Sequence, residues 1–274
     1  MQQGAASGTP QQQRQSDSEF NAAPLSNRSL TIGDSMRRLT LALIGMLVTV
    51  LPTYAQDYAW QNFAAQDAMN TLHIQLLRQT IEGSQSPGSS APTLPPSETA
   101  TTYSTSRQVS AKAQQQFLDF IKERSGDEAE QAVAGIFAQR APQDMWAELV
   151  AADGLAPGDA VDAMASYFAL NWVIANQQPE AEFSLAGVQR QVRAAMQADP
   201  AFQALDDAGR QEFAEVLMMN FLLQQAVLSD AYVRGDAQMM QQLAEAAVAR
   251  FKSEMGIDLR TLKPTSAGLV ASAS

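Results

Sequence analysis

The chain has 274 residues, of which 46% are hydrophobic, and its formal net charge is −11. It contains no cysteine and a single histidine, which excludes disulfides, thiolate nucleophiles and zinc sites built from cysteine or several histidines. The excess of acids disfavours nucleic acid as a partner, because affinity for a phosphate backbone depends on lysine and arginine. We interpret the acidity as a solubility feature, with a cationic partner as the alternative.

The N-terminal part of the chain predicts export. Residues 1–35 are polar and rich in glutamine, so we expect a disordered extension that cannot bury enough apolar area to fold. Residues 36–55 begin with Arg37 and Arg38, continue with an apolar run and end in small residues, which is the layout of a secretory signal peptide. We expect an exported, periplasmic or extracellular protein, with Met36 as a second candidate for the true start. An uncleaved signal is the alternative and would be the one membrane contact.

Two segments separate this region from the main domain. Residues 56–82 carry Leu72 and Leu76 at helical spacing, which predicts a short helical segment. Residues 83–104 are rich in proline, serine and threonine, and such a composition predicts a linker without packed structure.

Residues 105–262 form the predicted folded domain, and residues 263–274 a tail. Apolar residues recur at helical spacing, and nothing alternates with a period of two over a useful length. The predicted helices span residues 106–124, 127–139, 142–152, 157–178, 184–198, 207–234 and 236–255. We therefore predict an all-α fold, a single helical bundle of about seven helices.

Two of these helices, 157–178 and 207–234, are apolar on nearly all sides, which is typical of helices buried on all sides. We expect them to pack against each other, with the others around them. Each holds one central asparagine, Asn171 and Asn220. A buried amide without a partner costs about 1–3 kcal/mol, so we predict that the two meet or that each bonds a backbone carbonyl.

Short motifs along the domain carry a family resemblance. They are Tyr103 to Arg107, Gly154-Leu155, Asp162-Ala163, Tyr167, Asn171-Trp172, Arg210-Gln211-Glu212 and Gly256-Ile257-Asp258-Leu259. In this order they resemble an exported, all-helical bacterial family known only as domain of unknown function 6683. The resemblance covers roughly residues 103–268 and leaves out the glutamine-rich extension and residues 56–82. It implies export and a helical fold, and it brings no activity and no residue roles.

Residues suited to catalysis are scarce in the predicted domain. The single histidine, His73, precedes it, so a Ser-His-Asp triad is excluded there. Carboxylates are the exception: Asp159 and Asp162 share a helical face, as do Glu212 and Glu215. A pair of carboxylates in a cleft could hydrolyse a glycan, although acids at helix starts commonly act as caps.

We therefore expect a non-enzymatic domain that binds a partner protein or an apolar ligand in the cell envelope, without cofactor, metal or catalytic residues. The weak candidates for binding residues are Tyr167, Asn171, Trp172 and Asn220, which lie on the two central helices beside methionines that suit an adaptable groove. The alternatives are a carboxylate-dependent glycan hydrolase and a structural module that the linker spaces from the membrane.

Overall fold

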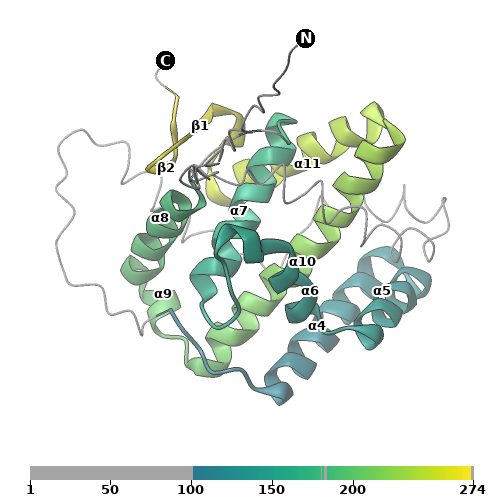
Figure 1. The fold of residues 1–274 in the computed structure, drawn as a ribbon. Coiled ribbons are helices and arrows are strands. Elements are labelled where there is room, and N and C mark those ends of the chain that lie inside the picture. Colours follow the sequence, from purple (N-terminus) through teal and green to yellow (C-terminus); the bar gives the residue numbers. More distant parts are fainter. Residues whose placement is uncertain (1–100, 180, 182–183, 273–274) are drawn as a thin grey trace, which may run out of the picture.

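The computed structural model describes residues 101–179, 181 and 184–272 (Figure 1). The predicted extension, signal peptide, short helical segment and nearly all of the linker lie outside these residues. The helices are α4 (Arg107–Ser125), α5 (Asp127–Gln139), α6 (Pro142–Val150), η3 (Ala151–Asp153), α7 (Ala160–Asn176), α8 (Leu185–Ala198), α9 (Pro200–Gln203), α10 (Asp207–Arg234), α11 (Ala237–Met255) and η4 (Leu259–Thr261).

The predicted all-α bundle is confirmed, and the seven predicted helices are present with small shifts at their ends. Side-chain caps fix four of the starts, because Asp159, Ser184, Asp206 and Asp236 accept hydrogen bonds from the backbone N–H groups two or three residues on. The largest shift is at α7, predicted to begin at residue 157. Gly158 has φ +103°, which no right-handed helix accommodates, so the helix begins after the Asp159 cap.

Helices α7 and α10 form the centre of the bundle, as predicted. Every residue from 160 to 175 of α7 is buried, and so is every residue from 213 to 225 of α10. These two helices pack on each other more extensively than any other pair. Helices α8 and α11 cover α7, helices α4, α6 and α11 cover α10, and α5 packs on the outside of α4. Figure 1 shows α10 running diagonally through the body.

Helix α10 is also long and apolar enough to cross a membrane by length and composition alone. Its apolar window is 72% buried inside the protein, which is the expected state of a core helix. Its hydrophobicity is therefore accounted for by packing within the bundle.

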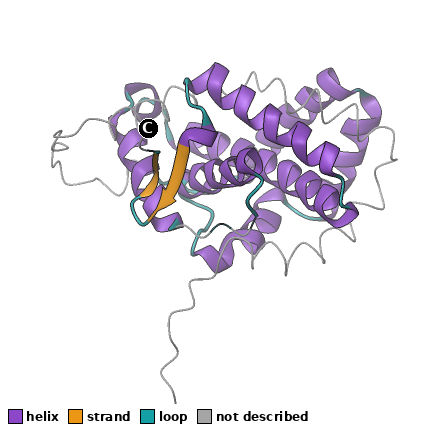
Figure 2. Cartoon of the chain, turned by 90° about the horizontal axis from the view of Figure 1, so that it is seen from above, coloured by secondary structure: helices purple, strands orange, loops and turns teal. Residues whose placement is uncertain are grey.

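The structure corrects the prediction that residues 263–274 form a tail, because most of them belong to a β-hairpin. Strand β1 (Leu262–Thr265) pairs antiparallel with β2 (Gly268–Ala271), and the pair lies at one end of the helical body (Figure 2). Leu262 and Leu269 are buried in the core, so the hairpin belongs to the folded domain. Strands of four residues are too short for alternation to stand out in the sequence.

Side chains from the helices hold the outer edges of this hairpin. The Gln191 amide of α8 donates to the Leu269 carbonyl at 2.9 Å and accepts from the Leu269 N–H at 2.8 Å, as a third strand would. On β1, the Trp172 indole donates to the Leu262 carbonyl at 3.0 Å, and Pro264 has no N–H to offer. These contacts protect the hairpin against pairing with another chain.

The structure also corrects the boundary between linker and domain. The predicted linker ends at residue 104, but its last residues, from 101 on, are part of the fold. Thr101 and Tyr103 are buried. Their backbones join the turn before α7: the Ala160 N–H donates to the Thr101 carbonyl at 3.0 Å, and the Tyr103 N–H donates to the Gly158 carbonyl at 2.9 Å. The composition of a proline- and threonine-rich stretch gave no sign of these contacts.

Candidate functional site

Two of the four residues predicted for binding, Tyr167 and Asn171, lie in a buried cluster between α7 and α11. The Arg250 guanidinium donates to the Asn171 side-chain oxygen at 2.5 Å and lies 6.0 Å from the centre of the Tyr167 ring. Phe251 stacks on the Tyr167 ring at 6.1 Å. Asn171 is fully buried and Arg250 is 5% exposed. The cluster joins the two helices from within the core.

The other two candidates, Trp172 and Asn220, are also buried in the bundle. Trp172 supports the hairpin through the bond to Leu262. Asn220 donates to the Val216 carbonyl of its own helix at 3.0 Å, and Asn171 donates to the Tyr167 carbonyl at 2.8 Å. The second form of the prediction for the two asparagines, a bond from each to a backbone carbonyl, is therefore confirmed.

The carboxylates at the start of α7 are held by groups of the fold. Asp159 caps the helix and forms an ion pair with Arg193 at 2.7 Å. Asp162 accepts from the Ala156 N–H at 3.0 Å and from the Gln189 amide at 2.7 Å. Burial raises the pKa of the Asp162 carboxyl, and these two hydrogen bonds lower it in part. Both acids fix the turn before α7.

The carboxylates at the start of α10 join it to α4. Glu212 pairs with Lys112 at 2.7 Å. Glu215 is buried, and one of its oxygens accepts from the Ser110 hydroxyl at 2.8 Å and the Gln211 amide at 2.7 Å. The Tyr103 hydroxyl is buried at this end of the bundle, and desolvation, with a smaller effect of Glu215, raises its pKa to about 12. These groups have packing roles between helices.

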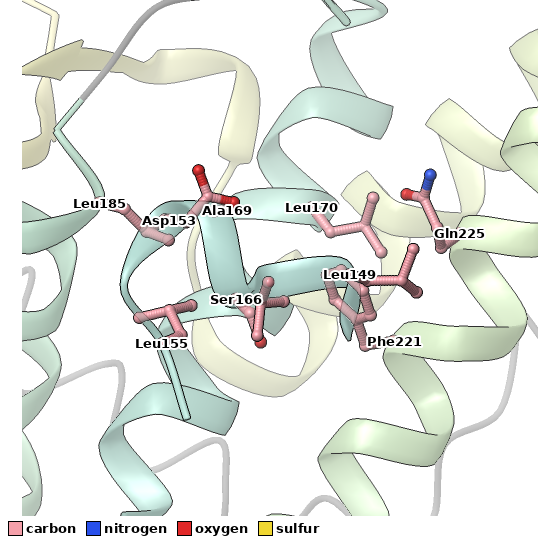
Figure 3. Close-up of a pocket in the computed structure, with 10 residues that line it drawn as sticks. Leu149, Asp153, Leu155, Ser166, Ala169, Leu170, Leu185, Phe221 and Gln225 are labelled. Carbon is pink, nitrogen blue, oxygen red and sulfur yellow. The ribbon is translucent and has the colours of Figure 1, made fainter. Parts of the chain in front are cut away.

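A recess opens where the end of α6 meets α7, α8 and α10, and it is our candidate site. Its walls are mostly apolar, and its volume is about 30 Å³ (Figure 3). The lining residues are Leu149, Val150, Asp153, Leu155, Ser166, Ala169, Leu170, Leu185, Phe221 and Gln225. A volume of this size holds a water or two, or the end of one side chain.

Three polar side chains line the recess, and two of them have unused acceptors. The Ser166 hydroxyl is committed, because it donates to the Ala163 carbonyl at 2.8 Å and accepts from the Trp146 indole at 3.1 Å. The Gln225 amide nitrogen donates to the Ser229 hydroxyl at 3.1 Å, whereas its oxygen is buried without a hydrogen-bond partner. In Figure 3 the Asp153 carboxylate and the Gln225 amide lie on either side of the apolar walls and point the same way.

Asp153 is the one ionisable group among the residues that line the recess. Burial raises the pKa of its carboxyl to about 6, and no neighbouring charge contributes to this shift. Desolvation disfavours the charged form of an acid, and an opposite charge nearby would have offset it. The fold therefore holds a carboxylate in an apolar setting without compensating it.

We predict that Asp153→Asn stabilises the protein near pH 7.5 by about 1 kcal/mol, after allowance for the solvent that still reaches the group. The folded-state pKa is raised, so ionisation costs stability as pH rises from about 4 through 6. At pH 4 the variant should equal the wild type. Urea unfolding at several pH values measures this, with Asp119→Asn on the surface of α4 as control. A destabilised variant at pH 7.5 would contradict the prediction. Burial also raises the pKa of Asp162, so part of the pH dependence of stability should remain in Asp153→Asn.

The sequence analysis missed Asp153, Ser166 and Gln225. Asp153 follows Leu149 and Val150 and precedes Leu155, so an acid within an apolar run was the available signal. Gln225 lies in a helix that is buried on all sides, where an amide needs a partner. Among the described residues, no group of three acids or histidines is placed to hold a metal ion.

Comparison with known proteins gives a family and nothing beyond it. The profile of a Family of unknown function (DUF6683) matches residues 40–272. The match therefore includes residues 56–82, which the resemblance had been expected to leave out. No curated protein and no solved structure matches the chain significantly.

Proposed function

The chain belongs to this family of unknown function, so its role has to be inferred from its own residues, and we propose that it is a non-enzymatic exported domain that docks a protein partner in the cell envelope. The partner inserts the end of a side chain into the recess. One observation carries the proposal: Asp153 is a partly buried acid in a mostly apolar recess, and burial raises the pKa of its carboxyl to about 6. Groups that are unfavourable for folding and perturbed in pKa cluster at functional sites.

The size of the recess favours a protein partner over a separate apolar ligand. Pockets that bind drug-sized molecules have volumes of about 300–1,000 Å³, whereas this recess offers about 30 Å³. Its walls are mostly apolar, as in the small depressions that receive a single anchoring side chain at an interface. Leu149 is half-buried at the rim and so is available to a partner.

The content of the recess favours binding over catalysis. Hydrolysis of a glycan by the predicted mechanism uses two carboxyl groups about 5–10 Å apart. Asp153 is a single carboxyl group among the lining residues, and Ser166 is committed to two hydrogen bonds. The carboxylate pairs at the starts of α7 and α10 are bound to groups of the fold, so we do not assign them a reaction.

Site-specific photocrosslinking tests the proposal. The full chain, produced in its own cell with a photoreactive residue at Leu149, should form an adduct with an envelope protein. The same group at Glu123, exposed on α4 and outside the recess, should not. The captured protein is identified by mass spectrometry, purified and titrated onto wild type and Leu149→Glu. We expect the variant to bind at least about tenfold more weakly, since a charge replaces an apolar wall. Equal affinity, or an adduct in the cytoplasmic fraction, would overturn the proposal.

A further inference from the structure

The unused polar atoms of the recess are all hydrogen-bond acceptors. They are the two oxygens of Asp153 and the side-chain oxygen of Gln225. Of the donors, the Ser166 hydroxyl donates to Ala163, and the Gln225 amide nitrogen donates one of its two N–H groups to Ser229. A group that satisfies the unpartnered oxygens must therefore bring hydrogen-bond donors.

We propose that the group received by the recess is the ammonium end of a lysine side chain of the partner, an inference that rests on the proposed function. An ammonium has three donors and no acceptor, and it is a compact charge on an apolar stem. In this arrangement the ammonium pairs with the Asp153 carboxylate, and the stem lies along apolar walls that include Leu170 and Phe221. A guanidinium is broader and planar, so it fits about 30 Å³ less well.

Charge complementarity supports this occupant. The chain carries a net charge of −11, and no basic side chain is among the residues that line the recess. In a site of low dielectric an ion pair is stronger than in water, so an incoming cation offsets the cost of the desolvated carboxylate. The acidic composition alone left a cationic partner as an alternative to a role in solubility. The proposal assigns such a partner a specific place, the recess.

The same arrangement makes binding depend on pH. The ammonium needs an ionised Asp153, and the side chains that face this carboxyl from α6, α7, α8 and α10 within the recess are otherwise neutral. Burial raises the pKa of Asp153 to about 6. Affinity should therefore be high above this pH and fall as the pH is lowered through it.

The probe for this inference is n-butylammonium, titrated onto the full chain and followed by NMR at the Trp146 indole N–H, which bonds Ser166 in the recess wall. We expect saturable binding near pH 7.5 that is at least about tenfold weaker near pH 5 and in Asp153→Asn. Asp119→Asn should bind as wild type. The variant is expected to be more stable than wild type, so a loss of binding cannot be ascribed to unfolding.

Two matched probes decide the chemistry. Neutral n-butanol has the same stem without the charge, and n-butylguanidinium has the other cationic head. Equal binding of either one, or no binding of n-butylammonium, overturns the lysine inference. The proposed function fails separately, through unchanged affinity of the captured partner for Leu149→Glu. Partner binding that is lost in Leu149→Glu but kept in Asp153→Asn would leave the docking site in place and remove the lysine.

Discussion

Gly187→Ala is expected to destabilise the protein by about 3 kcal/mol, at the upper end of the cost of overpacking. Gly187 lies in α8 where the turn of the hairpin crosses the helix. A β-carbon at this position would be 2.5 Å from the Gly268 backbone nitrogen and 2.7 Å from the Ser266 carbonyl oxygen. Backbone atoms cannot rotate away as a side chain does, so either the hairpin or the helix must move.

Hydrogen exchange and urea unfolding together measure this effect. The amide of Leu269, held by Gln191 in the wild type, should lose protection in Gly187→Ala, because the hairpin is displaced from α8. Gly135→Ala in α5 is the matched control. Nothing lies within 4 Å of a β-carbon added there, so the change should stabilise by about 0.5–1 kcal/mol through helix propensity. Equal effects of the two substitutions would show that the close contact at Gly187 has no energetic weight.

The helices could be predicted from the sequence because their determinants are local. Apolar spacing and capping residues lie within one segment, and Ser184 and Asp206 cap α8 and α10 where the pattern places them. The pairing of α7 with α10 needed one further step. A helix that is apolar on all sides must be covered by other helices, so two such helices are expected to pack on each other at the centre.

The hairpin and the recess could not be predicted, because they arise from contacts between distant segments. The hairpin depends on Gln191 and Trp172, which lie 78 and 90 residues along the chain from the carbonyls they bind. Only the fold brings these groups near each other. The recess combines the end of α6 with α7, α8 and α10. Tyr167 and Asn171 were candidates because they lie on the central helices beside methionines that suit an adaptable groove, but the structure uses them in packing with α11.

The buried cluster between α7 and α11 gives the second large effect: Asn171→Leu should destabilise the protein by about 2–4 kcal/mol. The change removes the oxygen that accepts from the Arg250 guanidinium at 2.5 Å. Arg250 is 5% exposed and Asn171 fully buried, so water cannot readily replace this acceptor. A hydrogen bond to a buried charge is worth more than one between neutral groups, which is why leucine, despite its similar volume, should be costly here.

A double-mutant cycle separates this bond from the loss of the amide itself. Combined with Arg250→Met, the change at Asn171 should cost less than it does alone, with a coupling energy of about 1–3 kcal/mol from urea unfolding. Asn220→Leu is the control, because its buried amide donates to the Val216 carbonyl of its own helix, an acceptor already used by the helix. It should cost less than about 1 kcal/mol. If Asn220→Leu proved as costly as Asn171→Leu, and the cycle showed no coupling, the Arg250 bond would not be what joins α7 to α11.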